Sequence, residues 1–183
     1  MKNSIKPLVM TALFAAITCV LSIISIPLPF SPVPFTLSLL AVFLSGSFLS
    51  PLWAFLSQTV YILIGIAGVP VFSGFRAGFA VIIGPTGGFL IAYPFMALIT
   101  ALFVKYFKKI NGFFLPLAGM VAALFVCYAF GTAVYCVYAK VSVAAALPAV
   151  VLPFIPFDCV KAAIAAALRL AVAKRTEKAN RTE

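Results

Sequence analysis

The hydrophobic residues of this chain gather into long apolar runs that polar residues scarcely interrupt. Such runs cover residues 8–26, 35–67, 86–104 and 113–138, and a last one follows Asp158. A membrane-spanning helix takes about 20 apolar residues, whereas the strands of a membrane β-barrel alternate apolar and polar residues over about 10. The unbroken runs therefore predict helices that cross a membrane.

Prolines mark the places where these runs break. Four prolines within residues 27–34 cannot continue a helix, so we expect an extended connector there. The 33-residue run 35–67 is interrupted near Pro51 and is either one overlong helix or two short ones. Residues 141–157 are apolar but contain three prolines, and their structure is left open. A final helix is expected from Asp158 to about residue 173.

The positive charges decide between one span and two in 35–67, because cytoplasmic loops of membrane proteins are rich in lysine and arginine. With six spans and a cytoplasmic N-terminus, ten of the 13 cations lie inside, Arg76 and Lys140 lie outside, and Lys161 lies within the last helix. With one span there, four cations would lie inside and eight outside. The ten inner cations are Lys2, Lys6, Lys105, Lys108, Lys109, Arg169, Lys174, Arg175, Lys178 and Arg181.

The predicted fold class is therefore an all-α membrane protein, a six-transmembrane-helix bundle with the N- and C-termini both cytoplasmic. We expect one integral membrane domain over residues 1–183, placed in the plasma membrane. Its spans are expected at about residues 8–26, 35–49, 52–67, 86–104, 113–138 and 158–173.

Composition agrees with this interpretation and narrows the chemistry. The chain is 65% apolar and 9% charged, which excludes a soluble globular protein and a disordered one. Membrane topology explains the net charge of +10, so no nucleic-acid partner is expected. Histidine is absent and the four cysteines stand singly, so we expect no metal site. Asp158 is the only acidic residue in the first 176 positions.

Asp158 and Lys161 form the strongest candidate site. They are three residues apart, so on a helix they share a face and pair. A lone acid near the middle of a membrane costs about 2.5–3.5 kcal/mol, which pairing or contact with water reduces. The pair is either purely structural or part of a ligand site, and its place at the outer start of a helix favours a ligand site.

The segment Gly84-Pro85-Thr86-Gly87-Gly88 is a second candidate. Its glycines let the backbone approach either a ligand or a neighbouring helix closely, and both interpretations stay open. The segment lacks the Gly-Lys-Ser/Thr ending of a phosphate loop. The chain is therefore not expected to hydrolyse ATP, and active transport would draw its energy from a partner or an ion gradient.

Two further features have a structural and a functional interpretation each. Arg76, alone in its loop, is either a solvated charge or the cation that binds a substrate carboxylate. Ala12 and Ala16, with Ala15, give the first helix a small-residue face that packs inside the bundle or docks on another membrane subunit.

Four motifs in this order resemble the BioY family, the biotin-specific substrate-binding subunits of energy-coupling-factor (ECF) transporters. They are Pro32-Val33-Pro34-Phe35-Thr36, Gly68-Val69-Pro70-Val71-Phe72, Gly84 through Gly88, and Pro153 through Lys161. The resemblance covers essentially the whole chain. It implies a six-helix bundle that binds biotin from outside, and three kinds of partner: the lipid bilayer, a transmembrane scaffold subunit that Ala12 and Ala16 would contact, and two cytoplasmic ATPase subunits.

The chain departs from the family pattern at several positions. Phe75, Ala77 and Phe157 stand where the family usually has glycine. Ser38 replaces glutamine, and Phe89 replaces tyrosine. These changes affect details of the pocket, whereas Asp158 and Lys161 are kept.

The resemblance also suggests roles for individual residues. We expect Asp158 to accept an N–H of the biotin ureido ring, with Lys161 setting its charge and orientation. Arg76 is the candidate for the biotin carboxylate, although Lys161 is an alternative. The supporting positions are Thr36, Thr86 and Gly87 as polar or backbone contacts and Phe35, Phe72 and Tyr93 as apolar walls. Biotin is the transported ligand, and no cofactor is expected.

Three other functions compete with biotin uptake. These alternatives are a binding subunit for another vitamin, an ion-coupled carrier in which Asp158 titrates, and a small membrane enzyme. The enzyme is poorly supported, because a single acid without histidine offers no catalytic partner. We therefore expect that the protein is not an enzyme.

Overall fold

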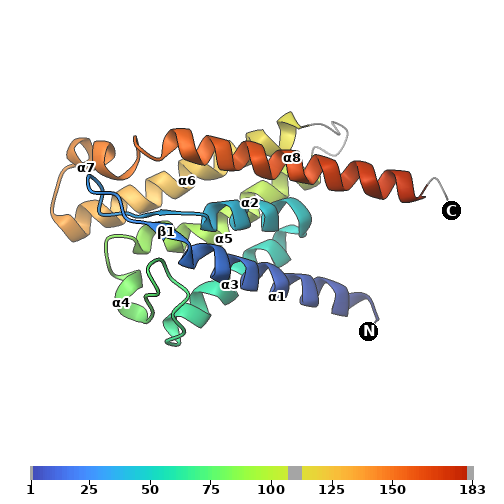
Figure 1. Ribbon diagram of the computed structural model, residues 1–183, viewed down its shortest axis with the longest axis horizontal. Coiled ribbons are helices and arrows are strands. Elements are labelled where there is room, and N and C mark those ends of the chain that lie inside the picture. Colours follow the sequence, from blue (N-terminus) through green and yellow to red (C-terminus); the bar gives the residue numbers. More distant parts are fainter. Residues whose placement is uncertain (1, 107–112, 181–183) are drawn as a thin grey trace.

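The computed structural model describes residues 2–106 and 113–180, and helices dominate them. Figure 1 shows the long helices running along the longest axis of the molecule. Both chain termini lie at one end, and β1, α4 and α7 lie at the other. In chain order the elements are α1 (Lys2–Ile23), β1 (Ser25–Ile26), β2 (Phe35–Thr36), α2 (Ser38–Phe48), α3 (Pro51–Ile66), α4 (Phe79–Ile82), α5 (Gly87–Tyr106), α6 (Phe114–Ala139), α7 (Val143–Val150) and α8 (Ile155–Asn180).

The connector between α1 and α2 is a short antiparallel ribbon closed by the proline-rich segment. Ser25 pairs with Thr36 and Ile26 with Phe35. The prolines between them have no N–H to donate to a helix or a longer strand, so pairing stops after two residues. The expectation of an extended connector is confirmed. The helix before it begins at Lys2 and not near residue 8, with Pro7 inside it.

The run 35–67 forms two helices that meet at Pro51. Leu49 is extended (φ −97°, ψ 157°), Ser50 is the N-cap of α3, and Pro51 occupies its first turn, where the missing N–H has no cost. Arg169 of α8 donates from Nε to the Ser47 carbonyl at 3.2 Å, which satisfies a carbonyl in the last turn of α2. The break expected near Pro51 is therefore present, and α8 holds the end of α2 in place.

Helix length sets a limit on the number of full membrane spans. Among the described residues, three helices are long and apolar enough to cross a membrane, namely α1, α5 and α6, and a fourth is counted if α7 and α8, bent by 55°, form one span. α2 has 11 residues, or about 16 Å, against a hydrocarbon thickness of about 30 Å. The structure thus gives three to four full-length spans and two shorter apolar helices, α2 and α3.

The C-terminal third of the chain differs from the expectation at both ends of its last helix. α7 occupies Val143–Val150 in the segment that had no assignment, and α8 begins at Ile155, three residues before Asp158. α8 also continues to Asn180, beyond the expected end near residue 173. Lysine and arginine are good helix formers, so the helix persists after its apolar stretch ends.

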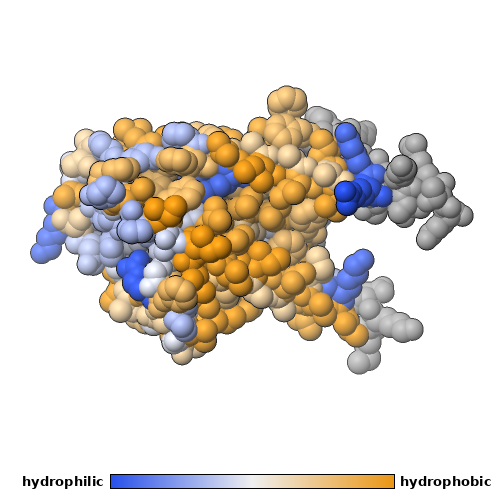
Figure 2. Space-filling model, in the orientation of Figure 1, coloured by the Kyte–Doolittle hydropathy of each residue, from blue (hydrophilic) through white to orange (hydrophobic). Residues whose placement is uncertain are grey.

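α5 lies at the centre of the bundle, against α6, α3 and α2. Its Gly88 packs directly on α6, since an added Cβ would lie 2.5 Å from the Phe130 carbonyl oxygen. Figure 2 shows hydrophobic residues over the middle of the visible face and more hydrophilic ones towards the end with β1, α4 and α7. This surface is typical of a protein embedded in lipid.

Most of the expected inner cations fall within the described residues. Lys6, Lys105, Lys174 and Arg175 are exposed, and Arg169 is half-buried. The expected inner cations Lys108, Lys109 and Arg181 lie outside the described residues.

Candidate functional site

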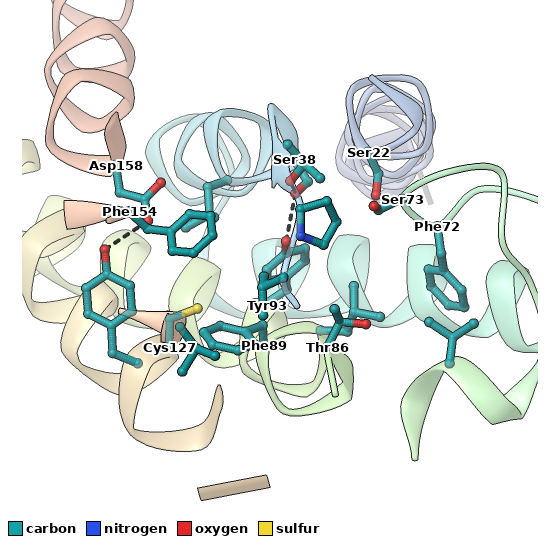
Figure 3. A pocket seen from close by; sticks show the side chains of 18 of the residues that line it. Ser22, Ser38, Phe72, Ser73, Thr86, Phe89, Tyr93, Cys127, Phe154 and Asp158 are labelled. Atoms are coloured by element: carbon teal, nitrogen blue, oxygen red, sulfur yellow. Dashed lines mark hydrogen bonds between the residues drawn. The ribbon is translucent and has the colours of Figure 1, made fainter. Parts of the chain in front are cut away.

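A mostly apolar cavity lies at the end of the bundle opposite the termini. The connector before α2, the loop between α3 and α4, the start of α5, the middle of α6 and the α7–α8 turn all contribute to its wall. Figure 3 shows side chains from these separate segments converging on one space. The enclosed volume is about 60 Å³.

A buried ion pair lies at one side of this cavity. Lys161 Nζ donates to Asp158 Oδ1 at 2.8 Å, and the two residues are 4% and 2% exposed. Tyr128 of α6 donates its hydroxyl proton to the other carboxylate oxygen, also at 2.8 Å (Figure 3). Lys161 Nζ also lies 4.1 Å from the centroid of the Phe35 ring, a cation–π contact. The pairing of Asp158 with Lys161 expected from their three-residue spacing is present, and Tyr128 adds a second hydrogen bond to the same carboxylate.

The start of α8 adds to the stabilisation of this carboxylate. Asp158 lies in the first turn of α8, where the helix dipole favours a negative charge. Its two oxygens each accept one hydrogen bond, and an ionised carboxylate offers about four acceptor positions. The carboxylate is therefore fixed in orientation and still has capacity to accept from a ligand.

A chain of hydroxyl groups forms a second polar element of the wall. Thr36 Oγ1 and Ser38 Oγ are 2.6 Å apart, and Ser38 Oγ lies 2.7 Å from the Tyr93 hydroxyl (Figure 3). The three residues come from β2, α2 and α5. This hydrogen-bonded chain holds three elements together at the cavity.

The loop that carries Arg76 covers another side. Phe72 N donates to the Arg76 carbonyl at 3.0 Å, which closes a tight turn, and Arg76 Nε donates to the Ser73 carbonyl at 3.0 Å. Gly74 N donates to Ser25 Oγ at 3.1 Å, which ties the loop to β1. Phe75 has φ 58°, a left-handed conformation that glycine adopts more readily. Phe75 therefore occupies a backbone conformation that glycine would adopt without strain.

Phe72 anchors this loop to the bundle. It is 1% exposed and packs at a right angle to Tyr61, with ring centroids 5.7 Å apart. Its ring also rests on Gly65 of α3, because an added Cβ there would lie closer to the ring than any allowed contact. The loop end that bears Arg76 is exposed, whereas its base is fixed.

The structure brings together seven of the nine residues expected to contact a ligand. The cavity lining includes Thr36, Phe72, Arg76, Thr86, Tyr93, Asp158 and Lys161. Phe35 and Gly87 do not line it. Phe35 lies behind Lys161 and contacts Phe157, and Gly87 packs on backbone, since an added Cβ would lie closer than any allowed contact to the Ile82 carbonyl.

Sequence reasoning missed other lining residues, among them Tyr128, Cys127 and Phe154. Each is an apolar or aromatic residue inside an apolar run, where no local signal separates a cavity wall from ordinary packing. On α1, away from the cavity, Ala12 and Ala16 are exposed, whereas Ala15 is buried.

Comparison with known proteins gives a consistent result. The chain is 36% identical over 169 residues to "Biotin transporter BioY" of Thermotoga maritima, covering 92% of this chain and 96% of that protein. It is 37% identical over 164 residues to "Probable biotin transporter BioY" of Bacillus subtilis, covering 88% and 87%.

Solved structures show the same likeness. A crystal structure of "the S-component for biotin from an ECF-type ABC transporter" superposes with a TM-score of 0.87 at 25% identity, covering 94% of this chain and 93% of that one. A second S component of a bacterial ECF transporter shares the fold, with a TM-score of 0.57 at 17% identity. Residues 1–178 match the BioY family, so the chain belongs to the BioY family.

Proposed function

We propose that this protein is the substrate-binding (S) component of an ECF-type importer and that it binds biotin at the cavity for uptake across the plasma membrane. Family membership and the names of its relatives support the substrate. The observation that carries the site is the buried group formed by Asp158, Lys161 and Tyr128 on the cavity wall. A buried ion pair in an otherwise apolar cavity suits a ligand that is apolar with a few polar groups.

The polar groups of biotin have matching partners. The ureido ring carries two N–H donors, and Asp158 still has acceptor capacity after bonding Lys161 and Tyr128. We assign the biotin carboxylate to Arg76. Its Nε donates to the Ser73 carbonyl, and the two terminal nitrogens of its guanidinium group are left to donate to a ligand. Lys161 is less suited, since Asp158 and the Phe35 ring already engage its ammonium group.

The remaining expected contacts have supporting roles. Phe72 and Tyr93 provide apolar walls for the bicyclic ring and chain, and Thr36 and Thr86 add hydroxyl groups. Sites for ligands of this kind usually enclose about 300–1,000 Å³, well above the 60 Å³ enclosed here. Binding therefore requires the connector and the Arg76 loop to move outward and close again over the ligand.

The proposed topology has six membrane crossings with both termini in the cytoplasm. In chain order α1, α2, α3, α5, α6 and α8 alternate in direction along the long axis, so that the start of α1 and the end of α8 lie at the same end (Figure 1). α2 and α3 would be short crossings, the first completed by the extended connector. The cavity then faces outward.

The proposed transport complex contains a transmembrane scaffold subunit and two cytoplasmic ATPase subunits. The chain itself has no phosphate-loop motif. The energy for uptake is therefore supplied by these ATPases, and the chain acts as a binding protein and not as an enzyme. The exposed small residues Ala12 and Ala16 of α1 are the proposed contact with the scaffold.

Labelled biotin binding to the purified protein tests this function. Wild type should bind, and Asp158→Asn should lose binding. That variant leaves Lys161 buried and unpaired, which costs about 3–5 kcal/mol and endangers the fold. The double variant Asp158→Asn/Lys161→Gln removes both charges, so we expect it to recover thermal stability without recovering binding.

Lys140→Gln is the matched control, because it removes an exposed positive charge outside the cavity lining. It should bind as wild type does. If wild type binds no biotin, or if the double variant binds as tightly as wild type, the proposed function or the proposed site is wrong. A competition panel of other vitamins against labelled biotin identifies the true ligand in the first case.

A further inference from the structure

Two phenylalanine rings of the cavity wall rest directly on glycines. Phe72 and Phe89 both line the cavity, and they are 1% and 8% exposed. A Cβ added to Gly65 of α3 would lie closer to the Phe72 ring than any allowed contact, and a Cβ added to Gly131 of α6 would do the same at the Phe89 ring. Each ring therefore occupies the space that a side chain on the helix behind it would fill, and we call this space a socket.

The backbone at the two socket positions does not require glycine. Both glycines lie inside helices, and the positive φ values among the described glycines occur elsewhere, at Gly68, Gly74 and Gly78. Alanine is more favourable than glycine inside a helix. What glycine provides at positions 65 and 131 is therefore the space for the ring.

The cavity is the direction in which a displaced ring would move. The Phe72 ring is held by Gly65 on one side and by Tyr61 on another, with ring centroids 5.7 Å apart. Beside Phe89, Gly88 packs on the backbone of α6, which fixes the separation of α5 and α6 there. The free space next to both rings is the cavity that they line. A methyl group added in either socket would therefore push its ring into the cavity.

The two rings bound different parts of the cavity. Figure 3 shows Asp158 and Phe72 at opposite sides of it, with Phe89 and Cys127 between them. Cys127 precedes Gly131 by four residues, so the two share a face of α6. The Phe89 ring thus lies against the part of α6 that faces the cavity next to Asp158.

Phe72 belongs instead to the loop that carries Arg76. Its backbone N–H donates to the Arg76 carbonyl at 3.0 Å. A shift of the Phe72 ring would therefore be passed to Arg76 through the backbone of this tight turn.

We propose that Gly131 and Gly65 are positioning residues for the ligand, because their sockets hold two wall rings back and so set the width of the cavity. Gly131 sets the room for the bicyclic ring beside Asp158, and Gly65 sets the room for the chain beside Arg76. The identity of the ligand rests on the proposed function. A change of one methylene in an apolar pocket alters binding by about 10–200-fold, so one methyl group behind a wall ring should have an effect of that order.

Gly131→Ala tests the first socket. We expect its biotin affinity to fall about tenfold. Gly119→Ala is the matched control. Gly119 is also buried on α6, and its added Cβ would lie 2.7 Å from the Phe103 side chain of α5, outside the cavity lining. The control adds the same methyl group between the same two helices, so it should bind biotin as wild type does. Equal losses in both variants would mean that Gly131 acts only through helix packing.

A smaller ring-site residue separates positioning from damage to the fold. In Gly131→Ala/Phe89→Leu, leucine leaves room for the added methyl group, so affinity should return to within about threefold of Phe89→Leu alone. Gly65→Ala and Gly65→Ala/Phe72→Leu test the second socket in the same way. Additive losses in either pair would overturn the positioning role of that glycine.

A crystal structure of ligand-free Gly131→Ala tests the first socket without any biotin. The Phe89 ring should have moved into the cavity, with α5 and α6 at their wild-type separation. Separated helices with the ring still out of the cavity would overturn the proposal. If wild type binds no biotin, the proposed function is wrong, and the position of the Phe89 ring in this structure still decides whether the socket sets the width of the cavity.

Discussion

At the scale of single residues, the scarcity of charge inside this protein makes the important groups visible. Asp158 and Lys161 were predictable from the sequence, because an acid and a base three residues apart stand out in an apolar chain and their helical spacing fixes their pairing. Tyr128 was not predictable. It is one of six tyrosines, and only the packing of α6 against α8 brings its hydroxyl to Asp158.

Tyr128→Phe tests the contribution of that hydroxyl. The variant removes one hydrogen bond to a charged oxygen and keeps the ring, so the fold should persist while biotin affinity falls about tenfold. Titration of the purified variant with biotin measures the change. Tyr138→Phe, at an exposed position on the same helix, is the control and should bind as wild type does. Equal affinity in both variants would mean that Tyr128 does not orient Asp158 for binding.

At the scale of elements, apolar runs and prolines predicted where helices lie but not all of their ends. The break at Pro51 was predictable, because Ser-Pro is a common helix start. The start of α8 at Ile155 was not, since Pro153 and Pro156 suggested a continuing loop. Pro156 fits the first turn of a helix, where its missing N–H has no partner to lose. The apolar pattern likewise marks the membrane part of α8 and gives no signal for its extension to Asn180.

Gly88→Ala tests the close approach of α5 and α6. The added methyl group would lie 2.5 Å from the Phe130 carbonyl oxygen, a backbone atom that moves only with its helix. We expect a loss of about 1–3 kcal/mol in the free energy of unfolding, the usual effect of overpacking a core. Thermal unfolding in detergent measures it. Gly84→Ala is the control, because its nearest contact is 3.3 Å, and it should lose less.

At the scale of the whole molecule, the distribution of positive charge and the lengths of the helices give different numbers of membrane crossings. Only three or four helices among the described residues have the length of a full span. The sequence predicted six crossings because the positions of lysine and arginine indicate on which side of the membrane each loop lies. Helix length instead indicates whether a helix is long enough to cross the hydrocarbon layer. In the proposed six-span topology, a connector and a loop at the cavity end would take up the rest of the crossings made by α2 and α3.

The exposed face of α1 has a prediction at this scale. Ala16→Trp places a bulky ring where a scaffold helix would approach closely, so the variant should bind biotin normally and fail to co-purify with the scaffold and ATPase subunits. Ala118→Trp places the same ring on exposed α6 and should co-purify as wild type does. Normal assembly of Ala16→Trp would show that the scaffold contacts another face.

The pairing of Asp158 with Lys161 also has an electrical consequence. A single charge carried across a membrane changes its energy by about 2.3 kcal/mol for every 100 mV of potential. Lys161 Nζ lies 2.8 Å from Asp158 Oδ1, and the two side chains together carry no net charge. Membrane voltage therefore exerts no net force on the pair as a whole. A variant that keeps only one of these two charged residues would place an uncompensated charge in the membrane field. Any movement of that charge across the membrane would then depend on voltage.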